Sequence, residues 1–231
     1  MKHFVLSVAA LLFAGFCPVA ANASAVSGEV DLLELHLGRG SDHLVMESTT
    51  TFGKGANQFV LKIDGGSDTR PAFEIFPVQA LYSRALSHNV AVLAGARHDF
   101  RTGPDLNYGA LGVEASLNDW LEVEHYFYLS DDGDLTGGGK VQARWPLAKR
   151  LVIEPRVIVN WSARAVPAEA LGAGINNVQG SFRLRREIGK NADLYAGYIH
   201  ERLVGQTRSI AIGAGQDGHV NRAIVGAGFR F

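Results

Sequence analysis

Apolar and polar residues alternate along most of this chain, which is the period expected of β-strands with two different faces. In the stretch WLEVEHYFYLS, residues 120–130, the odd-numbered positions from Leu121 to Leu129 are apolar except for His125. The even-numbered positions carry Glu122, Glu124, two tyrosines and a serine. One face of this segment is therefore suited to an apolar environment and the other to polar groups.

Twelve segments of this kind follow one another, separated by turn sequences such as GGSD at 65–68 and DDGD at 131–134. Each has roughly the 9–11 residues that a tilted strand needs to cross a bilayer. We expect an all-β fold, an antiparallel transmembrane β-barrel of about 12 strands, with 10 as the alternative. The expected strands are Val30–Gly38, Asp42–Thr51, Asn57–Asp64, Phe76–Leu86, Asn89–Phe100, Asn107–Ser116, Trp120–Ser130, Leu135–Leu147, Leu151–Ser162, Val178–Ile188, Asn191–Leu203 and His219–Phe231.

The alternation alone fits two architectures. In a soluble barrel or sandwich the apolar face points inward, whereas in a transmembrane barrel it meets lipid and the polar face lines the lumen. The even number of segments, their short turns and their charge-rich polar faces favour the membrane barrel. A soluble periplasmic barrel remains the competing architecture.

The last expected strand also favours the membrane. Phe229 and Phe231 share its apolar face, and Arg222 and Arg230 lie on the other face. The last strand of a barrel pairs with the first, because an unpaired edge is not tolerated in hydrocarbon. An alternating strand that closes with an aromatic residue resembles the signal by which barrel assembly machinery recognises its substrates, so we expect that machinery to be a partner.

Residues 1–23 have the features of a secretory signal peptide, with a charged start, an apolar run and the small residues Ala21-Asn22-Ala23. We expect cleavage before Ser24, which leaves residues 24–231 as a single outer-membrane barrel domain. Cys17 is the only cysteine and lies in the leader, so the mature domain has no disulfide and no thiolate ligand. No later stretch contains 18 consecutive apolar residues, which argues against spanning helices.

Composition adds two exclusions. With 47% hydrophobic residues the chain is not disordered, and its formal net charge of −1 offers no basic field for nucleic acid. The features together predict residence in the outer membrane of a Gram-negative cell, in contact with outer-membrane lipid.

Seven stretches in order resemble the copper resistance protein B family of outer-membrane proteins. They are VQALYSRAL at 78–86, LAGARHDF at 93–100, LSDDGDL at 129–135, RLVIEPR at 150–156, RLRREI at 183–188, YAGYIHER at 195–202 and NRAIVGAGFRF at 221–231. The resemblance runs from about Asp31 to Phe231. It implies a barrel that binds or exports copper ions at the outer membrane, alongside periplasmic copper-handling proteins.

This chain departs from the family in one respect. Family members commonly carry a Met- and His-rich stretch before the barrel, whereas Met46 is the only methionine here after the leader. Any copper route is therefore expected to use the barrel itself. The alternative is a general small porin or structural barrel without metal specificity.

Imidazole is a good ligand for copper, and seven histidines follow the leader. His36 and Met46 lie near the first two strands, where they could meet across a hairpin with His43. In the RHDF motif, His98 is expected at the barrel mouth with Asp99 as a nearby carboxylate, and Arg97 and Asp99 share the other face. The candidate copper ligands are His36, Met46, His98, Asp99 and His200, and the competing interpretation is that they are ordinary polar residues of turns and walls.

Charges on the polar faces suggest a second feature. Glu122 and Glu124 are expected to face the lumen, together with three arginines of later strands, Arg156, Arg183 and Arg185. An internal ion-pair lattice is one interpretation, and a carboxylate ladder that attracts cations is the other. No grouping of Ser, His and Asp suggests a hydrolase, and His200-Glu201 lacks the second histidine of a zinc protease motif, so we do not expect an enzyme.

Overall fold

The computed structural model describes residues 26–38, 43–66 and 75–231. The predicted leader lies outside these residues, as do parts of the expected turns near 40 and 67. Within the described chain, no helix is long and apolar enough to cross a membrane.

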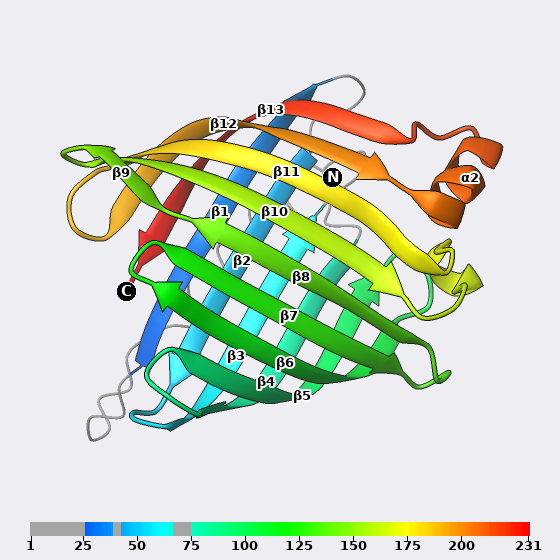
Figure 1. Cartoon of the computed structure of the whole chain (residues 1–231), viewed down its shortest axis with the longest axis horizontal. Coiled ribbons are helices and arrows are strands. Elements are labelled where there is room, and N and C mark those ends of the chain that lie inside the picture. Colours follow the sequence, from blue (N-terminus) through cyan, green and yellow to red (C-terminus); the bar gives the residue numbers. More distant parts are fainter. Residues whose placement is uncertain (1–25, 39–42, 67–74) are drawn as a thin grey trace, which may run out of the picture.

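The strands form one antiparallel sheet that closes on itself (Figure 1). Each strand pairs with the next, except that β8 and β9 both pair with β10, and β13 returns to pair with β1. The bounds are β1 Val26–Gly38, β2 His43–Phe52, β3 Asn57–Gly66, β4 Ile75–Ala85, β5 Val90–Arg101, β6 Leu106–Asn118, β7 Leu121–Ser130, β8 Leu135–Ala143, β9 Trp145–Ala148, β10 Leu151–Ser162, β11 Gly174–Glu187, β12 Ala192–Leu203 and β13 His219–Arg230. A 3₁₀ turn, η1 (Pro167–Glu169), precedes β11, and a helix, α2 (Gly205–Gly213), precedes β13.

Segments β8 and β9 occupy a single position in the barrel wall. Both pair with β10, β8 along its second half and β9 at its start. They are separated only by Arg144, whose backbone N–H donates to the Trp120 carbonyl. The described strands therefore build a closed barrel of 12 antiparallel positions, and the predicted strand 135–147 is confirmed with one interruption.

The two faces of the wall have the polarity of a transmembrane barrel. Large apolar side chains such as Phe127, Leu129, Phe182 and Phe229 are exposed on the outside. Inside, Glu154 is 0% and Arg156 1% exposed. The predicted inversion, with apolar residues outward and charges inward, is confirmed, and so are the two faces of the last strand.

The two ends of the barrel differ in their connections. The end that carries Val26 and Phe231 has turns of four residues or fewer, for example at 119–120 and 149–150. The other end carries the longer connections, 163–173 with η1 and 204–218 with α2. Outer-membrane barrels place short turns in the periplasm and longer loops outside, so the first end is the periplasmic end and the second is the outer end.

A register shift in β1 changes which residues face the lumen. Pairing with both neighbours slips between Val30 and Leu33. A bulge of this kind breaks strict alternation. As a result Asp31 and Glu34, which alternation would place on opposite faces, both form ion pairs inside the barrel.

Candidate functional site

Ionic groups fill the lumen, and the largest cluster belongs to the wall of β8–β12 and β1. Arg185 Nε lies 2.9 Å from Glu154 Oε2, and Arg144 Nε lies 3.0 Å from the same oxygen. Arg156 Nη2 lies 2.6 Å from Asp31 Oδ2 and 3.9 Å from Glu154 Oε1. We call this set the arginine cluster; its members are Asp31, Arg144, Glu154, Arg156, Arg185 and Asp193.

A smaller buried group lies on β1 and β11, where Arg183 spans from one strand to the other. Its Nε and Nη2 atoms donate to the two Glu34 carboxylate oxygens at 2.5 and 3.1 Å. His36 Nε2 lies 2.8 Å from Glu34 Oε2. Because a planar guanidinium matches a carboxylate with two parallel bonds, this pair holds the two strands in a fixed position.

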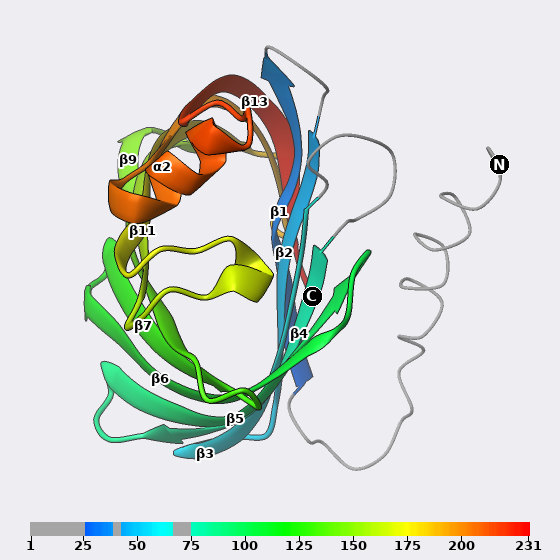
Figure 2. The ribbon, with the colours of Figure 1, turned by 90° about the vertical axis from the view of Figure 1, so that its right-hand side faces the viewer.

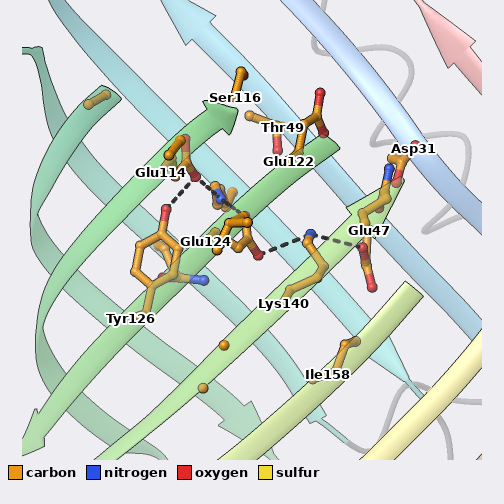
Figure 3. Close-up of a pocket in the computed structure, with 18 of the residues that line it drawn as sticks. Asp31, Glu47, Thr49, Glu114, Ser116, Glu122, Glu124, Tyr126, Lys140 and Ile158 are labelled. Atoms are coloured by element: carbon orange, nitrogen blue, oxygen red, sulfur yellow. Dashed lines mark hydrogen bonds and ion pairs between the residues drawn. The ribbon is translucent and has the colours of Figure 1, made fainter. Parts of the chain in front are cut away.

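Next to the arginine cluster, lysines and carboxylates line an open cavity of about 560 Å³, which shares Asp31 and Arg144 with the cluster (Figure 3). Lys62 pairs with Glu114 and, at 3.2 Å, with Glu124. Lys140 lies 3.0 Å from Glu124 and 4.0 Å from Glu47. The predicted lumen position of Glu124 is confirmed, and the ion-pair lattice exists.

The cavity carries more negative than positive groups. Its carboxylates outnumber its lysines and arginines by seven to four, with Asp64 and Glu122 making none of the ion pairs described here. The seven are Glu29, Asp31, Glu47, Asp64, Glu114, Glu122 and Glu124, against Lys62, Arg97, Lys140 and Arg144. The β4–β5 turn, which holds His88, also lines this cavity, so it reaches the periplasmic end. Arg156 lies outside this lining but pairs with Asp31 and Glu47 at 2.6 and 2.8 Å, so it neutralises part of the excess. The ion-pair lattice is therefore confirmed, and the attraction of cations by the carboxylates stays a prediction.

The predicted copper ligands lie in three separate places. His36 and His43 are cross-strand neighbours, buried near the outer end of β1 and β2. Met46 pairs with Leu33, which is three positions from His36 along β1. Because successive side chains of a strand point to opposite faces, Leu33 and its partner Met46 lie on the face opposite to His36 and His43. The hairpin brings the two histidines together and leaves the methionine outside the lumen.

The RHDF motif has the predicted faces. Arg97 and Asp99 point inward and form a two-bond ion pair at 2.6 and 2.7 Å. His98 points outward near the outer rim, where its Nδ1 lies 2.7 Å from Asn107 Oδ1 and its Nε2 lies 3.5 Å from Asp105 Oδ2. Asp99 and His98 are therefore on opposite sides of the wall.

His200 also lies on the outer surface of the barrel near the same end. Its Nδ1 is 2.7 Å from Asn221 Oδ1, the atom that also accepts from the Tyr198 hydroxyl. Across the ranges that the structure describes, no group of three or more His, Cys, Asp or Glu side chains is arranged to hold a metal ion. The role of these five residues as ligands stays a prediction.

Period two alone places Lys62 on the polar face of its strand, against Phe59, Leu61 and Ile63. Asp31, Glu34 and Lys140 were not predicted as parts of the lumen. Asp31 could not be predicted there, because its inward position depends on the β1 bulge.

Comparison with known proteins identifies the family. The model of the copper resistance protein B precursor (CopB) family matches residues 24–231. A copper resistance protein B homolog of Pseudomonas syringae pv. tomato is 26% identical over 85% of this chain and 66% of its own length. Copper resistance protein B of Escherichia coli is 24% identical over 86% of this chain and 67% of its own length. The chain thus spans about two thirds of these curated relatives.

Solved structures with the same fold are outer-membrane porins. The NanC porin superimposes with a TM-score of 0.59 and the KdgM porin with 0.52, each at 12% identity, over 89% of this chain and 99% of theirs. At this identity the likeness concerns the fold alone. It places the chain among outer-membrane β-barrels.

Proposed function

Because the chain belongs to the copper resistance protein B family, we propose that it protects the cell from copper by binding copper ions at the outer membrane or passing them across it. The family match over residues 24–231 is the observation that carries this proposal. Periplasmic copper-handling proteins are the partners we expect at its periplasmic end.

The charged groups of the lumen support the proposal. The cavity reaches the periplasmic end, and among the carboxylates that line it Asp64 and Glu122 make none of the ion pairs described above, so they are the groups we expect to attract cations. Carboxylate and imidazole groups are suitable ligands for Cu(II), and exchangeable binding by several of them lets an ion leave as well as enter. The lysines that pair with Glu114 and Glu124 keep that binding weak.

Copper tolerance of a deletion strain tests the function. Growth in copper is compared for cells that carry the wild-type gene, an empty vector, or variants at the lumen and at the predicted ligands. We expect the deletion to lower tolerance and Glu124→Gln with Glu114→Gln to restore it only in part. His36→Ala, His98→Ala and His200→Ala test the three predicted imidazole ligands through the copper content of the purified barrel.

Two controls separate copper handling from general permeability. Tolerance to zinc and nickel is measured in the same strains, and Gln142→Ala serves as an uncharged lumen substitution in the same cavity. Equal loss of tolerance to all three metals indicates a general porin, and no loss to any of them removes the proposed function.

A further inference from the structure

At the outer end, the connection between β10 and β11 folds inward. This segment, 163–173, is here called the plug segment. It lies within the ring of strands, with α2 on the rim beside it (Figure 2). Its Val166 is 2% exposed and exchanges two backbone hydrogen bonds with Leu171, at 2.9 and 3.1 Å, which close the segment into a compact loop around η1.

The plug segment touches the β5–β6 wall through two residues. Arg101 Nη2 donates to the Ala168 carbonyl at 3.3 Å. Glu169 faces Tyr108, Arg97, Asp99 and Arg101. A third contact reaches the β7–β8 turn, where Arg164 Nε lies 2.5 Å from Asp134 Oδ1 and Arg164 Nη2 donates to the Asp132 carbonyl at 3.2 Å. These contacts are polar and lie at the rim of the barrel, where water can replace them when the segment moves.

Arg97 connects the plug segment with the lumen cavity. It lines that cavity and also faces Glu169 of the plug segment. Its guanidinium lies 5.2 Å from the Tyr108 ring centre and 4.5 Å from that of Tyr128. Displacing the plug segment would therefore expose the ceiling of the cavity to the outside.

The base of the plug segment is held by α2. The Gly172 N–H donates to Thr207 Oγ1 at 2.9 Å, and the Ser162 hydroxyl donates to the Gly172 carbonyl at 2.5 Å. A Cβ atom on Gly172 would collide with Gln206 Cβ and lie 2.7 Å from the Thr207 backbone nitrogen. Only glycine lets the plug segment and α2 approach this closely.

We propose that the plug segment is a gate, closed in this structure, whose outward movement joins the lumen cavity to the outside. The cavity reaches the periplasmic end, where the β4–β5 turn lines it. Its hinge is the Gly172 contact with α2, and its resting contacts are those of Ala168, Glu169 and Arg164 with the wall. The proposal concerns access to the cavity and holds for any ion that enters it.

Gly172→Val tests the gate, because the added side chain drives the plug segment away from α2 without touching the wall. Gly180→Val on β11 is the matched control, since a Cβ there meets nothing within 4 Å. Potassium chloride conductance is recorded in planar bilayers. The rate at which maleimide labels a cysteine at position 166 measures how exposed the plug segment is. The reporter variant is Val166→Cys, combined with Cys17→Ser so that it is the single cysteine.

We expect low conductance and slow labelling in the wild type and in the control. Gly172→Val should raise both by about tenfold, as expected when one or two hydrogen bonds that hold a closed state are lost. Faster labelling with unchanged conductance would show that the plug segment moves without gating. Wild-type conductance equal to that of Gly172→Val would show that the barrel is open already.

Heat-modifiable migration on a gel confirms that each variant is a folded barrel. If Gly172→Val does not fold, Arg101→Ala replaces it, because it removes the hydrogen bond to Ala168 from the wall side. The same two outcomes then overturn the proposal.

Discussion

Replacing Glu154 by glutamine is the most direct test of the arginine cluster. Glu154 is 0% exposed, and its carboxylate lies 2.9, 3.0 and 3.9 Å from nitrogen atoms of Arg185, Arg144 and Arg156. The glutamine keeps the shape of the side chain but removes the negative charge. Three guanidinium groups then face one another, and the nearest remaining carboxylates are those of Asp31, Glu47 and Asp193.

The expected cost follows from this geometry. Removing one partner of a buried ion pair destabilises a protein by about 3–5 kcal/mol, because the remaining charge is buried without compensation. Here the other carboxylates share part of that charge, so we expect about 3 kcal/mol, the lower end of that range.

Unfolding in urea from lipid vesicles, followed by tryptophan fluorescence and heat-modifiable migration, measures the free energy of unfolding. Glu122→Gln is the matched control, since Glu122 also lines the lumen cavity but makes none of the described ion pairs. A loss below 1 kcal/mol for Glu154→Gln, or a loss equal to that of the control, would refute the view that the cluster stabilises the barrel.

Three further predictions concern the plug, the wall and the seam. Burial raises the pKa of Glu169 above its ordinary value of 4.5, with Asp99 adding to the rise and Tyr108, Arg97 and Arg101 opposing it. The protonated form therefore docks more firmly, so docking is strongest below pH 4.5 and weakens as the pH rises through the raised value. Because maleimide reacts with the thiolate, the labelling rate of Val166→Cys is divided at each pH by that of free cysteine under the same conditions. This ratio should be larger at pH 8 than at pH 4, and Glu169→Gln should remove the difference. Gly197→Ala should lower the free energy of unfolding by about 2 kcal/mol or more, because a Cβ there overlaps the Phe182 carbonyl and lies 3.0 Å from Arg183 Cα; equal urea midpoints for Gly197→Ala and wild type would contradict this. Phe231→Ala removes the ring that covers Gly28 at the β1–β13 seam, and we expect a smaller heat-modifiable fraction in isolated outer membranes, with Phe229→Ala as the comparison on the same strand.

The sequence predicted the wall of the barrel better than its contents. Period two follows from the pleat of each strand, so Glu154 and Arg156 could be assigned to the lumen without any tertiary information. The predicted boundaries differ from the observed ones by a few residues, as with β11, which begins at Gly174 rather than Val178. The interruption between β8 and β9 at Arg144 could not be predicted, because apolar and polar residues alternate through it without a change of period.

Partners across the lumen could not be predicted. Arg183 and Glu34 are 149 positions apart in the chain, and they meet only because closure of the barrel brings β1 beside the last strands. The plug segment was seen only as a gap between strands, since no period distinguishes a loop that turns inward from one that extends into solvent. Candidate ligands such as His98 and His200 were chosen by residue type, and their outward direction separates them from the carboxylates of the lumen.

The seam between β1 and β13 also has a kinetic consequence. Gly28 and Phe231 exchange two backbone hydrogen bonds, each 2.8 Å, whereas every other pairing of neighbouring strands joins segments close together in the chain. Neighbouring strands can pair one hairpin after another, because each pairing closes only a short loop. The last pairing closes a loop of about 200 residues, and contacts between residues so far apart in the chain are the slowest to form. A nearly complete barrel with two free edges is therefore the expected late intermediate, and the rate of its closure decides how long those edges stay open to pairing with a neighbouring chain.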